Sequence, residues 1–229
     1  MMNKIKTLYK NSFIFKKIDK LENKHYQKQL TNSDFTILCP NCIGGLIYHR
    51  LGQKFDSPTI DLSINTEDFS YFLEYLDYYI SKDVEPSGFN KDGKPVGVIQ
   101  GNGNEVPNIY IHFTHYNSFE SGRDKWNQRK IRIHKDNCYI IAYDLNDMFE
   151  EDSNKCGYIN NECLERISNF KSNNKVLFTR NPECECDFSY YIEPNYNGPF
   201  PLVYLNRNII GLMPFETEFD FTNFINKKL

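Results

Sequence analysis

The residues best suited to chemistry in this sequence are two histidines and an aspartate. His112 and His115 lie three residues apart in the segment 108–116, and Asp144 follows the apolar segment 138–143. An imidazole can act as a general base near neutral pH, and a carboxylate can orient that base or bind sugar hydroxyls. We therefore interpret His115 and Asp144 as candidate catalytic residues. The alternative is structural: one core histidine, one histidine at a strand end, and an aspartate that caps a turn or helix.

A second candidate region lies within residues 35–62. An apolar segment, 35–38, is followed by a polar turn, a glycine pair and a helical pattern at 43–51. This order predicts a strand that breaks sharply into a helix. The amides at a helix start are unpaired and can face an anion, and glycine lets that anion approach the backbone. The candidate ligand-binding residues here are Asn41, Cys42, Gly44 and Gly45.

Further candidate ligand-binding side chains come from other predicted elements. Arg129 belongs to a basic cluster on the predicted helix 118–133, and a planar guanidinium matches phosphate or carboxylate geometry. A solvated basic face is the alternative. Ligands of open α/β sheets bind at the carboxyl ends of the strands, so we expect four strand ends to converge on one crevice. The candidates added by this argument are His112, Tyr116 and Arg180.

The seven cysteines have an odd count and no framework spacing, which predicts reduced thiols. Cys39 and Cys42 form half of a zinc-knuckle pattern, but Cys184 and Cys186 are too closely spaced to complete it. We therefore predict no metal site and no cofactor. One alternative gives Cys42 a nucleophilic role in a hydrolase, with its pKa lowered by the helix start.

The order of predicted elements favours an α/β fold. Strands at 35–38, 59–62, 95–99, 108–116, 137–145 and 175–180 are interleaved with helices, including a long amphipathic helix at 66–83. This alternation predicts a three-layer α/β/α architecture with a mixed, largely parallel sheet. We expect residues 1–30 to form a basic helical segment packed on the domain, and residues 31–229 to form a single α/β domain.

Charge and hydropathy exclude several classes of partner. The net charge of −3 provides no basic face for nucleic acid. No segment approaches the ~20 apolar residues that cross a bilayer, and the basic N-terminus lacks the apolar core of a secretory signal. We expect a cytoplasmic protein whose N-terminal segment makes, at most, weak peripheral contact with an anionic membrane surface. The oligomeric state stays open.

Several ordered strings resemble those of a known family. They are Asn-Cys-Ile-Gly-Gly at 41–45, I-Y-x-x-L-G at 47–52, Ser-Pro-Thr at 57–59, His-Phe-Thr-His-Tyr at 112–116 and Lys-Trp-x-x-Arg at 125–129. Over roughly residues 33–182 the chain resembles the bacterial DUF1919 family, whose members are described as exopolysaccharide or lipopolysaccharide biosynthesis proteins. The resemblance implies a role in surface-polysaccharide synthesis and assigns no catalytic residue.

These observations lead to one functional hypothesis with two alternatives. The hypothesis is a transferase that moves a sugar or other group from a phosphate-bearing activated donor. Residues 41–45 and Arg129 would receive the anionic part, His115 would be the base, and Asp144 would orient the base or bind sugar hydroxyls. The first alternative is a non-catalytic sugar- or nucleotide-binding module of an assembly pathway. The second is a hydrolase that uses Cys42.

Overall fold

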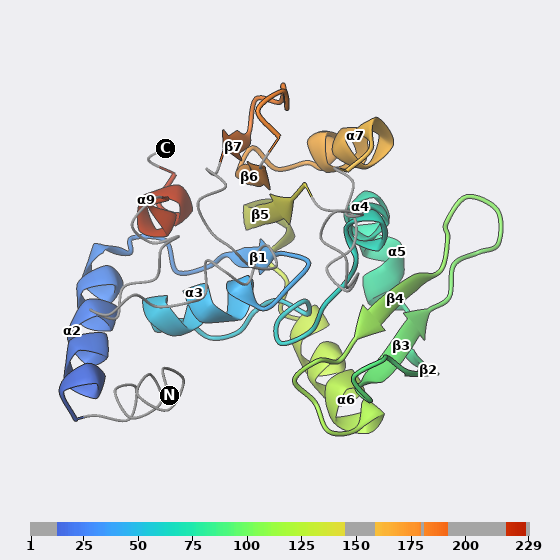
Figure 1. The fold of residues 1–229 in the computed structure, drawn as a ribbon, viewed down its shortest axis with the longest axis horizontal. Coiled ribbons are helices and arrows are strands. Elements are labelled where there is room, and N and C mark those ends of the chain that lie inside the picture. Colours follow the sequence, from blue (N-terminus) through green and yellow to red (C-terminus); the bar gives the residue numbers. More distant parts are fainter. Residues whose placement is uncertain (1–12, 145–158, 180, 192–218, 228–229) are drawn as a thin grey trace, which may run out of the picture.

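The computed structural model describes residues 13–144, 159–179, 181–191 and 219–227 (Figure 1). At its centre is a four-stranded sheet of β1 (Thr36–Leu38), β5 (Cys138–Tyr143), β6 (Lys175–Thr179) and β7 (Ser189–Tyr191). The strand order is β1-β5-β6-β7, and every neighbouring pair is parallel. The predicted α/β fold class is therefore confirmed, because parallel neighbours need crossover connections such as the helices between them.

Alternate residues of the parallel strands enter two different hydrophobic cores. On one face, Ile37, Ile141 and Phe178 pack with α3 (Ile43–Leu51) and α9 (Phe221–Ile225). On the other face, the intervening strand residues pack with α4 (Thr66–Glu74), α5 (Leu76–Ser81) and α7 (Asn161–Asn169). All six residues of β5 are buried, as expected for a strand covered on both faces. Helices thus cover the sheet on two sides.

The first described helix, α2 (Phe13–Gln29), lies beside α3 in Figure 1. Tyr26 near its end, and Leu30 directly after it, pack against the core that contains α3 and α9. The side-chain amide of Asn226, just after α9, donates to the Gln29 carbonyl at 2.8 Å. The two ends of the described chain therefore meet on one face of the sheet.

The histidine-bearing strand does not join the parallel sheet. β4 (Ile109–His112) pairs instead with β3 (Pro95–Ile99), which pairs with β2 (Glu85–Phe89), in a separate antiparallel sheet. The other edge of β4 is also occupied, because His112 bridges to Ser63 and the Tyr110 amide donates to the Asp68 carboxylate at 2.8 Å. The expected single sheet is therefore two sheets, and one of the four converging strand ends belongs to the smaller one.

Two predicted elements differ locally from the structure. The segment 59–62, predicted as a strand, is mostly a turn in which Asp61 has a φ of 63°; only Ser63 makes a bridge. The long helix predicted at 66–83 is divided at Tyr75 into α4 and α5. Its N-cap is Asn65, whose side chain accepts a hydrogen bond from the Asp68 amide.

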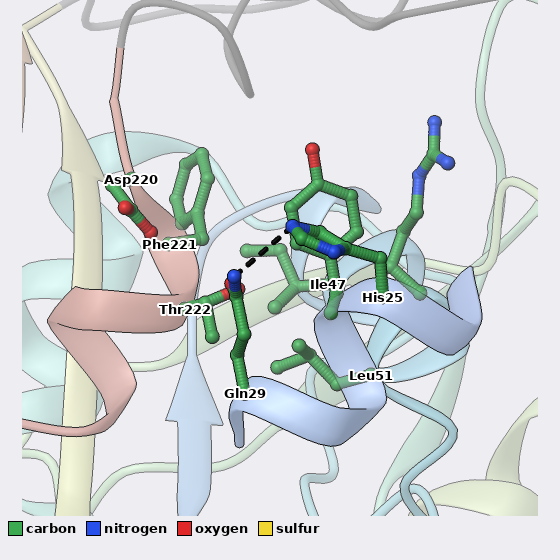
Figure 2. A pocket seen from close by; sticks show the side chains of 9 residues that line it. His25, Gln29, Ile47, Leu51, Asp220, Phe221 and Thr222 are labelled. Carbon is green, nitrogen blue, oxygen red and sulfur yellow. Dashed lines mark hydrogen bonds between the residues drawn. The ribbon is translucent and has the colours of Figure 1, made fainter. Parts of the chain in front are cut away.

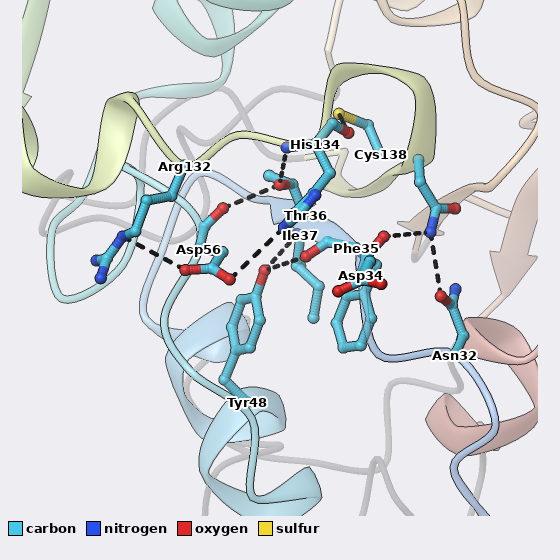
Figure 3. A network of polar contacts seen from close by, with 11 residues as sticks. Asn32, Asp34, Phe35, Thr36, Ile37, Tyr48, Asp56, Arg132, His134 and Cys138 are labelled. Atoms are coloured by element: carbon cyan, nitrogen blue, oxygen red, sulfur yellow. Dashed lines mark hydrogen bonds and ion pairs between the residues drawn. The ribbon is translucent and has the colours of Figure 1, made fainter.

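A polar network fixes the loops around the beginning of β1 (Figure 3). The Thr36 hydroxyl donates to the Asp56 carbonyl at 2.9 Å and accepts the His134 amide at 2.8 Å. The Asp56 carboxylate lies 3.3 Å from Arg132 Nε and 3.6 Å from His134 Nε2. These contacts hold two segments against β1: the segment just before residues 57–61, and the segment just after α6 (Phe119–Lys130).

Candidate ligand site at the carboxyl ends of the parallel strands

Asp144 lies at the carboxyl end of β5, between the neighbouring strands β1 and β6, and is 2% exposed. Its Oδ2 accepts a short hydrogen bond from the Thr179 hydroxyl and a second, at 3.3 Å, from the Asn181 amide. Both donors follow or end β6, so sheet pairing brings them to the carboxylate. A buried carboxylate held by several donors is fixed in orientation.

Asn41 and Tyr143 complete this end of the sheet. Asn41 follows β1, is 3% exposed, and places its side-chain amide within hydrogen-bonding reach of the Tyr143 hydroxyl. Burial raises the pKa of Tyr143 far above its ordinary value, so the phenol stays protonated. We define the carboxyl-end site as Asn41, Tyr143, Asp144, Thr179 and Asn181.

The first amides of α3 already have partners within the protein. The Ile43 amide donates to Asn41 Oδ1 at 2.9 Å, and the Gly44 amide donates to Cys39 Sγ at 3.2 Å. The Cys39 thiol in turn donates to the Asn41 carbonyl at 3.0 Å. Two of the amides that we expected to face an anion are therefore satisfied by the turn itself.

Close packing accounts for both glycines of α3. A Cβ on Gly44 would lie 2.8 Å from Cys39 Sγ, and a Cβ on Gly45 would lie 2.9 Å from Ile60 Cγ2. Both distances are shorter than an ordinary van der Waals contact between a carbon and another heavy atom. The glycine pair lets α3 approach β1 and residue 60, so it needs no ligand to explain it.

The prediction of a low pKa for Cys42 was wrong. Burial raises the pKa of this thiol above its ordinary value, and the nearby negative charge of Asp61 raises it further. Burial also raises the pKa of Cys39, to about 12. The helix start does not offset these effects, and both groups stay thiols. Within the described residues, no three His, Cys, Asp or Glu side chains gather closely enough to hold a metal ion.

Arg129 organises a second group of residues beside the start of α3. It is 6% exposed. One guanidinium nitrogen, Nη1, donates to the Ile60 carbonyl at 2.7 Å and to the Tyr116 hydroxyl at 3.2 Å. The other, Nη2, donates to Asp61 Oδ2 at 3.2 Å. The guanidinium also lies over the ring of Phe55. We call Asp61, Tyr116 and Arg129 the Arg129 cluster.

The two histidines occupy different environments. His112 is half-buried and pairs through its backbone with Ser63, and the next amide, of Ile64, donates to the Pro40 carbonyl at 2.9 Å. β4 is thereby tied to the end of β1. His115 lies in the turn after β4 and is exposed. Among the described contacts, no hydrogen bond or ion pair joins His115 to Asp144. Arg180 lies outside the described residues.

Two hollows of the described surface lie away from these residues. A cavity of about 240 Å³ lies between α2, α3 and α9, where Figure 2 places His25 and Gln29 opposite Asp220 and Thr222. A groove of about 830 Å³ runs between α4, α5 and α7. Neither contains a predicted site residue. We place the candidate site by its buried, converging polar groups, because position at the strand ends and a fixed carboxylate indicate chemistry more directly than volume does.

Comparison with known proteins identifies the family. Residues 11–226 match the family described as "Domain of unknown function (DUF1919)". The chain belongs to this family. A Haemophilus influenzae protein described as "Uncharacterized protein" is 31% identical over 173 residues, which cover 75% of this chain and 74% of that protein. None of the helices in the described part of this DUF1919 protein is both long and apolar enough to cross a membrane.

The structure adds three residues that the sequence argument did not select: Asp61, Tyr143 and Asn181. Asp61 lies within a segment that was predicted as a strand. In the structure its backbone is left-handed, and the chain turns there toward α3. Tyr143 reads from sequence as an apolar strand residue. Asn181 belongs to no sequence motif. Its amide reaches the Asp144 carboxylate only because β6 pairs with β5, and that pairing could not be seen in the sequence.

Proposed function

We propose that this DUF1919 protein binds a sugar-bearing small molecule at the carboxyl-end site and transfers a group from a phosphate-bearing activated donor. The setting we propose is the synthesis of surface polysaccharide. The pathway rests on the family resemblance, whereas the location and chemistry rest on the residues. The observation that carries the proposal is the Asp144 carboxylate, which is almost fully buried at the end of the central strand.

A carboxylate withdrawn from water is unfavourable unless other groups satisfy it. Thr179 and Asn181 supply two donors to a single oxygen, which fixes the carboxylate plane. Such fixed, buried carboxylates are common among groups that bind substrate hydroxyls or orient a catalytic base. In this proposal Asp144 accepts hydrogen bonds from sugar hydroxyls, and Asn41 provides a neighbouring amide.

His115 remains our candidate for the base of the transfer step. It is exposed after β4, and the pairing of His112 with Ser63 places that strand beside the end of β1. The base would remove a proton from the acceptor hydroxyl as that oxygen attacks the donor, and the phosphate-bearing group would leave with the bonding electrons.

A binding module without catalysis is the second candidate, and one observation favours it. His115 makes no described contact that would hold it against Asp144, whereas catalytic bases are usually oriented by a partner. The hydrolase that uses Cys42 has lost its main support, because the pKa of the thiol is raised and a thiolate is the reactive form.

Thermal unfolding with a panel of nucleotides, nucleotide sugars and free sugars tests the proposal. A ligand at about 100 times its Kd adds roughly 2.7 kcal/mol to the free energy of unfolding. We expect one nucleotide-sugar class to stabilise the wild type and Asp144→Asn to remove that effect. Asp83→Asn, at an exposed carboxylate, is the matched control. Stabilisation by no member of the panel would refute the proposal.

Turnover separates the two candidates. For a transferase, His115→Ala abolishes release of the donor's phosphate-bearing group but keeps ligand stabilisation. His49→Ala, at another exposed histidine, should change neither. A wild type that binds the ligand without turnover with any acceptor sugar would support the binding module.

A further inference from the structure

Asp61 lies between Arg129 and the start of α3. Its Oδ2 is held by Arg129 at 3.2 Å, and its Oδ1 lies 3.4 Å from where a Cβ of Gly45 would be. Its charge acts on the thiol of Cys42 and on the hydroxyl of Tyr116. Through Asp61, the Arg129 cluster thus reaches the start of α3.

The backbone of Asp61 is left-handed. Its φ of 63° is one of two positive values among the described residues other than glycine. Most side chains disfavour this conformation, whereas aspartate and asparagine adopt it more readily than other residues. Its neighbours Ile60 and Leu62 are buried, yet the Asp61 side chain is 37% exposed. The backbone therefore turns this carboxylate out of the core toward solvent.

The charges beside Asp61 are already matched. The guanidinium of Arg129 is engaged by the Ile60 carbonyl, the Tyr116 hydroxyl and Asp61 itself. The Ile43 and Gly44 amides at the start of α3 donate to Asn41 and Cys39. A phosphate placed here would face a carboxylate, and like charges at close range repel. A hydroxyl group, in contrast, could donate to Asp61 Oδ1, for which the described residues supply no donor.

We propose that Asp61 binds hydroxyl groups of the sugar, and that the phosphate of the activated donor lies away from the start of α3. This inference rests on the proposed function and specifies which part of the ligand faces which residues. From the sequence we expected the phosphate at the start of α3; the ligand orientation proposed here is the reverse. Arg129 then acts as a positioning residue, because it holds Asp61 Oδ2 and leaves Oδ1 toward the ligand.

Calorimetric affinities of Asp61 variants test the orientation. The probes are UDP-glucose, UDP-galactose, GDP-mannose and dTDP-glucose, their parent nucleotides UDP, GDP and dTDP, and inorganic phosphate. Asp61→Asn preserves size and tolerates positive φ, and Asp61→Gly fits that backbone without strain, so at least one variant should fold. Asp83→Asn is the exposed control, and Asp144→Asn reports on the carboxyl-end site.

We expect Asp61→Asn to weaken the preferred nucleotide sugar on the order of tenfold, the effect of removing a hydrogen bond to a charged group. Affinity for the parent nucleotide should stay within about twofold, because it lacks the sugar. Tighter binding of nucleotide or inorganic phosphate by the variant would overturn the inference, since it would place phosphate beside Asp61. An equal loss for sugar and parent nucleotide would also overturn it.

Failure of this inference and failure of the proposed function give different results. If Asp61 variants bind the nucleotide sugar like wild type while Asp144→Asn does not, Asp61 is structural and the proposed function stands. If no probe binds the wild type, or Asp144→Asn binds normally, the proposed function fails and this inference fails with it.

Discussion

The hydroxyl of Thr179 donates a hydrogen bond to the Asp144 carboxylate across two neighbouring parallel strands. Both side chains are almost fully buried, at 1% and 2% exposure. The sheet therefore determines the orientation of the carboxylate before any ligand arrives. A group prepared in this way can bind a hydroxyl without first reorganising.

Thr179→Val tests how much this contact stabilises the fold. The variant keeps the β-branched shape but removes a donor from a buried, charged acceptor. We expect the free energy of unfolding to fall by about 1–3 kcal/mol, measured by urea denaturation. Thr179→Ser retains the hydroxyl and should lose much less. Equal losses in the two variants would show that the methyl group matters and the hydrogen bond does not.

The close approach of Gly44 to Cys39 allows a second test. It asks whether the glycine is required for packing inside the protein or for the approach of a ligand. Gly44→Ala introduces a methyl group 2.8 Å from Cys39 Sγ, and we expect overpacking to lower the free energy of unfolding by about 1–3 kcal/mol. Removing the sulfur should relieve the clash. Gly44→Ala in a Cys39→Ala background should therefore be less destabilising than in the wild type, by about 1 kcal/mol in a double-mutant cycle.

Strict additivity of Gly44→Ala and Cys39→Ala would contradict the packing explanation. A fully stable Gly44→Ala protein that has lost ligand stabilisation would restore the original interpretation, in which the glycine serves ligand approach. The two interpretations therefore differ in which measurement changes.

Local patterns in the sequence predicted the main strands and the fold class because those patterns are properties of neighbouring residues. The unbroken apolar run of β5 predicted a strand covered on both faces, and each of its residues is buried. Likewise, the alternation of strands and helices predicted the parallel sheet. The position of Asp144 at the end of β5 followed directly.

Contacts between distant segments could not be predicted in the same way. β4 has the composition of a sheet strand, but its partners are β3, Ser63 and the Asp68 carboxylate, and nothing near His112 in sequence specifies them. The glycine pair was assigned to ligand approach because sequence does not reveal Cys39 and Ile60 against it. The turn at Asp61 reads as a strand for the same reason, since Arg129 holds it from 68 residues away.

Asp68 provides a prediction on pH. Its carboxylate accepts the Tyr110 amide, but burial raises the pKa of this group from 3.8 to about 6. Because the folded pKa exceeds the unfolded value, the stability that Asp68 contributes is full below about pH 4 and is lost as the pH rises through about 6. At pH 8 the buried carboxylate is charged and unfavourable.

Asp68→Asn keeps an oxygen that can accept the Tyr110 amide and removes the charge. We expect the variant to be more stable than the wild type at pH 8 by about 3 kcal/mol. The difference should shrink as the pH falls and be small near pH 4, where the folded carboxyl is protonated and about half of the unfolded carboxyls are. Urea denaturation at pH 4, 6 and 8 measures this, and the exposed Asp83→Asn should show little dependence. A difference between Asp68→Asn and wild type that stays constant with pH would mean that folding does not change the pKa of Asp68, and would contradict the raised pKa.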